Sequence, residues 1–150
     1  MNHREIRFNI LHNLYQKHYS DQLGHPQMTD SLIDDSGLGE IDKNLVYGDI
    51  MYLADSGLVK GQYMLGRASP FAIQITNHGI DVVESIIDDF VQDLETAKIG
   101  NDVKTDMRQI STENSPNIRI KKVWEYVKEH PDFILNVFDK FLKHYLGPTT

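Results

Sequence analysis

The chain has no cysteine among its 150 residues. This absence excludes a disulfide framework, a thiolate metal site and a cysteine nucleophile. Long apolar runs are also missing, because no stretch approaches the roughly 18 uninterrupted apolar residues of a membrane-spanning helix. The first residues lack the apolar core of a signal peptide, so we expect a cytoplasmic protein.

Positive charge is scarce. Lys and Arg number 15 against 22 Asp and Glu, which gives a net charge of −7. The deficit is concentrated in residues 81–117, with three basic against nine acidic residues, whereas residues 118–150 hold six against four. Nucleic-acid binding needs local positive potential, so this balance works against such a partner unless the few cations gather on one face.

Apolar residues make up 40% of the chain and charged residues 25%, as in an ordinary globular protein. The apolar spacing predicts four helices, over residues 4–19, 30–35, 41–56 and 77–94. Helical spacing returns after Asn117 and breaks at His130-Pro131. We expect Thr29 or Asp30 to cap the second helix and the Thr76 hydroxyl to cap the fourth.

The chain is organised around residues 44–76. Val46, Ile50 and Leu53 form one apolar stripe, and Gly57 follows where a left-handed C-cap is expected. Residues 58–64 and 71–76 have β character, and the turn-rich segment between them carries Arg67. The pattern predicts a helix, a Gly-Leu turn and a two-stranded ribbon.

The predicted fold is therefore mainly α with a small β-ribbon. We divide the chain into a helix-turn-helix domain with its ribbon and fourth helix over 1–94, and an amphipathic helical hairpin over 118–150. Residues 95–117 are either a linker or a continued helix, since the apolar periodicity weakens there and polar residues dominate.

Residues 4–94, about 60% of the chain, resemble the winged helix-turn-helix domains of small prokaryotic transcription regulators. The stripe from Val46 to Leu53 followed by Gly57-Leu58-Val59 is similar to the recognition helix and turn of the MarR, PadR and ArsR groups. The stretch from Ile75 to Gly79 is similar to their second wing strand entering the fourth helix.

The resemblance implies a DNA-binding transcription regulator with double-stranded DNA as its partner, acting as a homodimer. Its third helix would enter the major groove and its wing would contact the backbone. Transferred by position, the implied DNA-binding residues are Lys43, Asn44, Tyr47 and Met51 on the helix, and Lys60, Gln62, Arg67 and Ser69 on the wing.

The sequence departs from this pattern on the third helix. Gly48 stands where a longer polar side chain is usual, and we expect Asp49 and Asp55 to place negative charge on the helix. Arg7, in the first helix, is expected to lie towards water. The third helix also has only one Lys and no Arg, and this depletion of basic residues favours an alternative, a winged-helix protein-protein interaction module without DNA binding. A third interpretation is a ligand-gated sensor with an apolar effector pocket between the fourth helix and the C-terminal hairpin.

A set of large apolar residues is expected to mediate dimerisation or to form core. Its members are Ile87, Phe90, Val91, Leu94, Trp124, Phe133, Val137, Phe138, Phe141 and Tyr145.

Motifs of catalysis and metal binding are absent. The seven histidines form no H-x-x-x-H pattern, and no nucleophile elbow or phosphate loop occurs. Asp88, Asp89 and Asp93 are expected to form a solvated face. We therefore expect no enzymatic activity, no cofactor and no metal.

Overall fold

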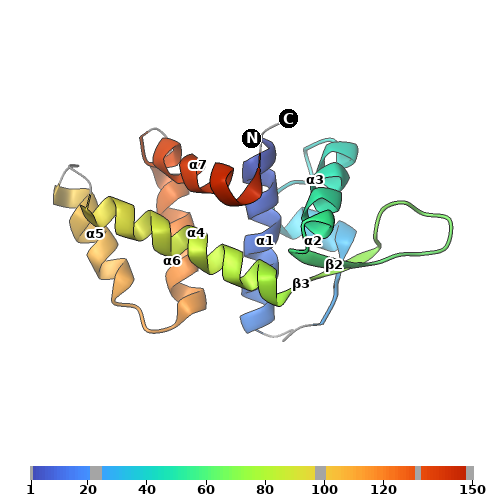
Figure 1. Ribbon diagram of the computed structural model, residues 1–150, viewed down its shortest axis with the longest axis horizontal. Helices are drawn as coiled ribbons and strands as arrows, with labels where there is room; N and C mark the ends of the chain where they lie inside the picture. Colours follow the sequence, from blue (N-terminus) through green and yellow to red (C-terminus); the bar gives the residue numbers. More distant parts are fainter. Residues whose placement is uncertain (1, 21–24, 97–100, 131–132, 148–150) are drawn as a thin grey trace. The chain divides into compact units, whose positions relative to one another are not determined.

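The computed structural model describes residues 2–20, 25–96, 101–130 and 133–147. It is mainly helical with a small three-stranded antiparallel sheet, as the predicted fold class requires (Figure 1). The chain divides into two compact units. The first lies within Met1–Val83 and the second is Glu84–Gly147. Within the described residues, no helix is long and apolar enough to cross a membrane.

The first unit holds three helices, three short strands and the beginning of a fourth helix. In chain order these are α1 (His3–Tyr19), β1 (Gln27–Met28), α2 (Thr29–Asp35), α3 (Lys43–Asp55), β2 (Val59–Gln62), β3 (Ala72–Ile75) and α4 (Asn77–Thr96), which crosses into the second unit. α1 packs against α2, α3 and β3. The predicted helices agree with these bounds to within two residues at their starts and ends.

The sheet has the order β1-β3-β2, and both pairs are antiparallel. Val59 pairs with Ile75 across β2 and β3, and Gln27 pairs with Ile73 across β1 and β3. The prediction of a two-stranded ribbon therefore missed one strand, β1. A two-residue strand is too short for alternation to be visible in the sequence.

α3 ends in a Schellman turn. Gly57 has φ of 76°, and its N–H donates to the Ala54 carbonyl at 3.0 Å. The N–H of Leu58 donates to the Leu53 carbonyl at 2.9 Å. The predicted left-handed C-cap is confirmed, because this conformation suits a residue without Cβ. α2 ends in the same way at Gly37, with φ of 72°.

The cap predicted for α2 was wrong. Met28 occupies the N-cap position and makes no side-chain capping bond. Thr29 lies inside the helix and is buried, and its hydroxyl donates instead to the Pro70 carbonyl at 2.9 Å. That bond joins the start of α2 to the segment entering β3. α3 is capped by Asp42, whose carboxylate accepts from the Asn44 N–H at 2.9 Å.

Thr76 links the end of α3 to the start of α4. Its hydroxyl oxygen accepts from the Gly79 N–H at 3.0 Å, which confirms the predicted cap, and the hydroxyl donates to the Gly57 carbonyl at 2.6 Å. The Thr76 N–H donates to the Leu58 carbonyl at 3.1 Å. A Cβ on Gly79 would lie only 2.2 Å from that carbonyl oxygen, so only glycine fits at this contact.

The second unit consists of most of α4, α5 (Asn101–Ser111), α6 (Pro116–Glu129) and α7 (Phe133–Leu146). Its core is aromatic. The ring of Phe138 packs edge-on against Phe90 at 4.9 Å and lies 5.6 Å from Trp124 between ring centroids. α5 shows that residues 101–111 are helical, and residues 97–100 lie outside the described residues.

Gly79→Ala is expected to lower the free energy of unfolding by about 1–3 kcal/mol, because the added methyl group forces the two backbones apart. Gly48→Ala is the matched control, at a helical position where a Cβ would meet nothing within 4 Å. It should raise the free energy of unfolding by about 0.5–1 kcal/mol. Urea denaturation followed by circular dichroism measures both. Equal stability of Gly79→Ala and the wild type would contradict the contact.

Candidate nucleic-acid interface

The outward face of α3 carries a row of three residues, of which Asn44 and Gly48 are exposed and Met51 is half-buried. Asn44, Gly48 and Met51 follow one another at helical spacing and line hollows on both sides of the helix. We call them the hairpin-side hollow, about 360 Å³, and the α1-side hollow, about 390 Å³. Gly48, which has no side chain, lines both hollows.

The hairpin-side hollow brings together residues that are distant in the sequence. The loop between β2 and β3 projects beyond the sheet (Figure 1), and Arg67, Ala68 and Ser69 of this loop complete the hollow opposite α3. Tyr63, at the start of the loop, donates a weak hydrogen bond to Met51 Sδ at 3.7 Å. Five of the eight predicted DNA-binding residues thus line one surface: Asn44, Tyr47, Met51, Arg67 and Ser69. Lys43, Lys60 and Gln62 are exposed but do not line it.

Tyr47 is held in place by α2. Its hydroxyl donates to Asp30 Oδ1 at 2.5 Å. This hydrogen bond, helped by partial burial, raises the pKa of Tyr47, and nearby Arg67 acts in the opposite direction. The phenol therefore stays protonated at neutral pH, and its oxygen can still accept one hydrogen bond. The same contact places the Asp30 carboxylate beside the hollow.

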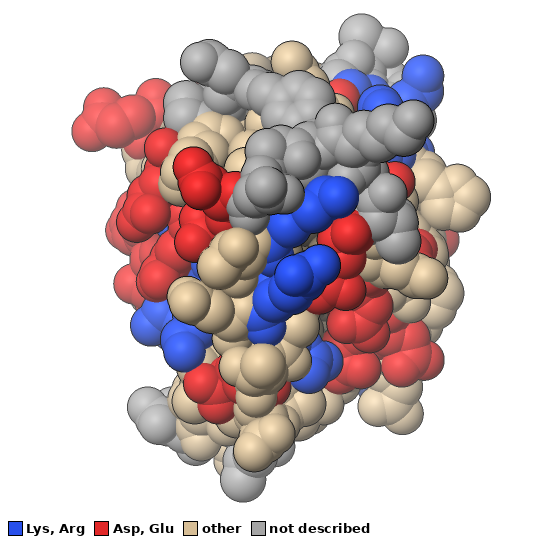
Figure 2. Space-filling model, turned by 90° about the vertical axis from the view of Figure 1, so that its left-hand side faces the viewer, with Lys and Arg blue, Asp and Glu red and all other residues tan. Residues whose placement is uncertain are grey.

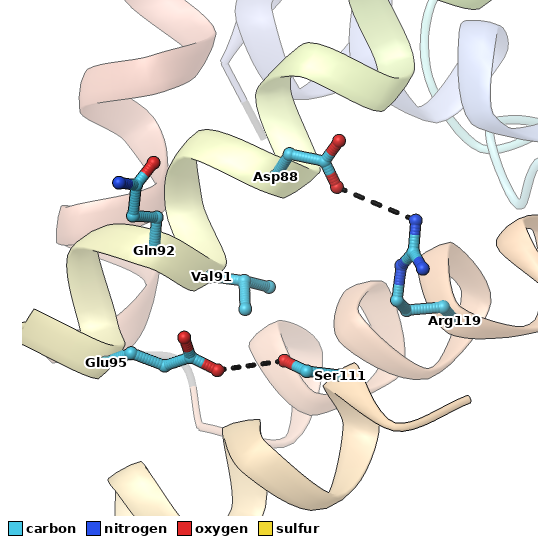
Figure 3. Close-up of a pocket in the computed structure, with 6 residues that line it drawn as sticks. All are labelled: Asp88, Val91, Gln92, Glu95, Ser111 and Arg119. Carbon is cyan, nitrogen blue, oxygen red and sulfur yellow. Dashed lines mark hydrogen bonds and ion pairs between the residues drawn. The ribbon is translucent and has the colours of Figure 1, made fainter. Parts of the chain in front are cut away.

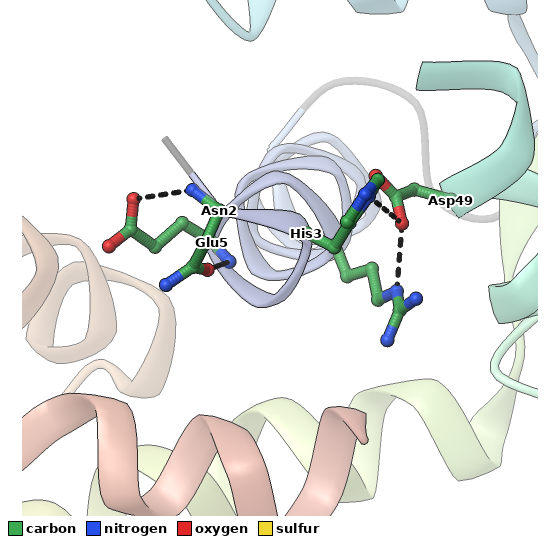
Figure 4. Close-up of polar contacts among 5 residues, drawn as sticks. Asn2, His3, Glu5 and Asp49 are labelled. Carbon is green, nitrogen blue, oxygen red and sulfur yellow. Dashed lines mark hydrogen bonds and ion pairs between the residues drawn. The ribbon is translucent and has the colours of Figure 1, made fainter. Parts of the chain in front are cut away.

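The α1-side hollow has a buried ion pair at its base. Asp49, 2% exposed, accepts from Arg7 Nε at 2.9 Å and lies 2.8 Å from His3 Nδ1 (Figure 4). The guanidinium of Arg7 also lies 3.6 Å from the ring centroid of Tyr52. Two expectations were wrong, because Arg7 does not point to water and Asp49 does not charge the outward face of α3. α3 presents less negative charge than its sequence suggests.

α1 begins with a capping box that fixes the position of His3. Asn2 Oδ1 accepts from the Glu5 N–H at 2.8 Å, and Glu5 Oε2 accepts from the Asn2 N–H at 3.4 Å (Figure 4). These two bonds satisfy backbone donors that the first helical turn leaves unpaired. The start of α1 is thereby defined next to the ion pair of Asp49.

Charges of both signs surround the α3 face in similar numbers. Lys43, Lys60 and Arg67 are exposed and have no ion-pair partner among the described residues. Acidic residues close to them include Asp42 at the helix cap and Asp30 beside Tyr47. The local potential available for phosphate binding is therefore modest.

The second unit has a separate polar hollow of about 250 Å³ (Figure 3). Its lining comes from α4, α5 and α6 and includes Asp88, Glu95, Ser111 and Arg119. The described lining includes α5 and no residue of α7, so this hollow differs from the apolar pocket expected between the fourth helix and the C-terminal hairpin, which stays a prediction. Asp88 and Asp93 are exposed, as expected for a solvated face, although Asp88 lies 3.7 Å from Arg119. Asp89 departs from the expectation, because it is half-buried and accepts from the Tyr145 hydroxyl at 2.7 Å.

Acidic and basic side chains are mixed on the face shown in Figure 2, where a short run of basic side chains is bordered by acidic ones. Among the described residues, no group of three or more His, Asp or Glu side chains is placed to hold a metal ion. The visible part of the face in Figure 2 therefore carries no continuous strip of basic side chains.

The residues assigned to dimerisation are mostly buried in the single chain. Ile87, Phe90, Val91, Leu94, Trp124, Val137 and Phe138 are buried, and Phe141 and Tyr145 are half-buried. The side chain of Phe133 lies outside what the structure describes. The buried residues of this set therefore form part of the core of a single chain. The association of two chains remains a prediction.

Arg7→Ala is expected to lower the free energy of unfolding by about 3–5 kcal/mol, because it leaves the buried Asp49 carboxylate without its permanent cation. Lys17→Ala is the control, since Lys17 pairs with Asp35 at 3.1 Å on the surface and should contribute about 0–1 kcal/mol. The double change Arg7→Met with Asp49→Leu should recover most of the loss. Urea denaturation tests all three. A loss for Arg7→Ala no larger than for Lys17→Ala would contradict the buried pair.

The chain was compared with known proteins at three levels. No family model, no curated protein and no solved structure matches it. Its function must therefore be inferred from its own residues and their geometry.

Proposed function

We propose that the protein binds double-stranded DNA and regulates transcription through a winged helix-turn-helix domain within residues 1–94. In this proposal α3 is the recognition helix, and the β2–β3 hairpin with its loop is the wing. The order of α2, a glycine turn, α3 and an antiparallel hairpin supports this assignment. The carrying observation is that Asn44 and Tyr47 of α3 line one hollow together with Arg67 and Ser69 of the β2–β3 loop.

These side chains offer hydrogen-bonding groups suited to nucleic acid. An Asn side chain can make a bidentate contact with adenine, as proposed for Asn44. Arg67 can bind a phosphate or the edge of guanine, and the Ser69 hydroxyl can donate to a phosphate oxygen. The major groove is about 12 Å wide and admits an α-helix. Tyr47, fixed by Asp30, would present its oxygen to a base donor.

Gly48 supports close approach of a partner to α3. A glycine inside a helix costs about 1 kcal/mol relative to alanine. The other described glycines have a structural reason, either a positive φ or a close neighbour, as at Gly57 and Gly79. Gly48 has neither, since its φ is not positive and a Cβ there would meet nothing within 4 Å. Its position between the two hollows is explained if a nucleotide lies against the helix backbone.

A homodimer is part of the proposal because one domain has few cations. Lys43, Lys60 and Arg67 are the exposed basic residues near the interface. Two copies would double these contacts and set the spacing of two half-sites along the DNA.

A second candidate function, binding a protein partner, is favoured by one observation. Three consecutive large apolar residues at the start of the β2–β3 loop are exposed: Tyr63 by 46%, Met64 by 53% and Leu65 fully. An exposed apolar cluster of this kind is common at protein interfaces. The DNA-binding experiment below separates the two candidates, because this second function predicts no DNA binding at low salt.

Fluorescence anisotropy with labelled random duplex DNA tests the leading proposal. If the three cations contact phosphates, the slope of log K against log salt concentration should be about −2.7 per domain, which is three times −0.9. Arg67→Ala should weaken binding and make this slope shallower by about 0.9. Lys17→Ala, a basic residue of α1 already paired with Asp35, is the control and should change neither. Absence of binding at about 50 mM salt would refute DNA binding, because phosphate contacts are strongest at low salt.

Gly48→Ala should have opposite effects on stability and on binding. The added methyl group stabilises the helix and also occupies the space that the nucleotide would use, so affinity for DNA should fall about tenfold while the melting temperature rises. Asn13→Ala in α1 also raises helix propensity but lines neither hollow, and it should leave affinity unchanged. Thermal denaturation and anisotropy measure the two quantities. Unchanged affinity of Gly48→Ala for DNA would show that no close approach occurs.

A further inference from the structure

The polar hollow of the second unit has unmatched hydrogen-bonding capacity at both of its ends. At one end, the Arg119 side chain is only 27% exposed, and its nearest carboxylate oxygen, Asp88 Oδ1, lies 3.7 Å away. This distance is too long for a hydrogen bond. Among the described residues, Arg119 makes this ion pair and no side-chain hydrogen bond. The Arg119 guanidinium is therefore paired with Asp88 at ion-pair distance only, and it keeps N–H donors for an acceptor on a ligand.

The other end has more acceptors than donors. The Ser111 hydroxyl oxygen lies 3.0 Å from Glu95 Oε1 and 2.7 Å from the Met107 carbonyl oxygen. A hydroxyl carries a single proton, so it can donate fully to only one of them. The Met107 carbonyl is the closer acceptor, and donation to it leaves the half-buried Glu95 carboxylate without this donor.

The two ends are separated by a single apolar side chain of α4. Asp88 and Glu95 are seven residues apart, which corresponds to about 10 Å along a helix. Val91 lies between them at the centre of the hollow (Figure 3). A complementary ligand therefore has an anionic acceptor at one end, a cationic donor at the other, and several carbon atoms between them.

We propose that this hollow binds a small zwitterion whose carboxylate and ammonium groups are separated by a chain of about four to six carbons. The ligand carboxylate would accept from the guanidinium of Arg119, because a planar guanidinium fork matches a carboxylate. The ligand ammonium would donate to Glu95, and its methylene chain would lie on Val91. The volume of about 250 Å³ suits a ligand of this size. All of the residues involved belong to the second unit, so this site does not depend on DNA binding.

Isothermal titration calorimetry of the full chain with 6-aminohexanoate tests the site. Hexanoate and hexylamine each carry one of the two charged groups, and glycine carries both at a short separation. We expect 6-aminohexanoate to bind about tenfold or more tightly than any of the three, because only it can reach both ends. Equal binding of glycine would overturn the proposed spacing, and absence of binding by 6-aminohexanoate would overturn the site.

Two substitutions and a control locate the binding. Arg119→Gln and Glu95→Gln keep the approximate shape of each side chain and remove its charge, and each should weaken binding of 6-aminohexanoate about tenfold or more. Lys122→Gln is the control, because Lys122 lies on the same helix as Arg119 and pairs with Glu113 at 3.1 Å outside the hollow. Circular dichroism checks that each variant folds. If Arg119→Gln does not fold, Arg119→Lys takes its place. Lys keeps the positive charge but lacks the planar guanidinium, so this variant should bind 6-aminohexanoate less tightly than the wild type. Binding that is unchanged in both charge-removing variants would overturn the assignment.

Discussion

The first unit depends on the hydrogen bonds of one threonine. Thr76 uses its N–H and its hydroxyl proton on the carbonyls of Leu58 and Gly57, and its hydroxyl oxygen receives the first turn of α4. Three elements therefore meet at one point: the turn after α3, the end of β3 and the start of α4. The absence of a Cβ at Gly79 permits this approach. These contacts hold the end of α3 next to the end of β3 and the start of α4.

Local features of this junction could be predicted from the sequence. A glycine directly after an apolar stripe indicates a helix end at Gly57, and a threonine before a new apolar period indicates a cap at Thr76. Both signals involve neighbouring residues. The third strand could not be predicted, because its two residues owe their conformation to pairing with β3. Thr29 was misassigned for a similar reason, since its partner is the carbonyl of Pro70, 41 residues further along the chain.

Prediction of the site was also limited by long-range contacts. Helical spacing identified the residues of α3 that face outward, and the loop position of Arg67 and Ser69 suggested that they belong with them. Charge was the less reliable guide. An acidic residue is normally placed at the surface, but Asp49 stands three residues after Val46, within the apolar period of α3, and Arg7 neutralises it from α1. A charge within an apolar period is a signal that could have indicated a buried partner.

The Schellman turns have a consequence for the order of folding. The turns that end α2 at Gly37 and α3 at Gly57 are formed by hydrogen bonds between residues at most five positions apart. Forming such a turn therefore costs little loop-closure entropy. The pair of Arg7 with Asp49 joins residues 42 positions apart and needs a long loop to close. Local contacts generally form before distant ones. The α2–turn–α3 segment is therefore expected to form early in folding. We expect α1 to pack against it later, when the buried carboxylate of Asp49 pairs with Arg7.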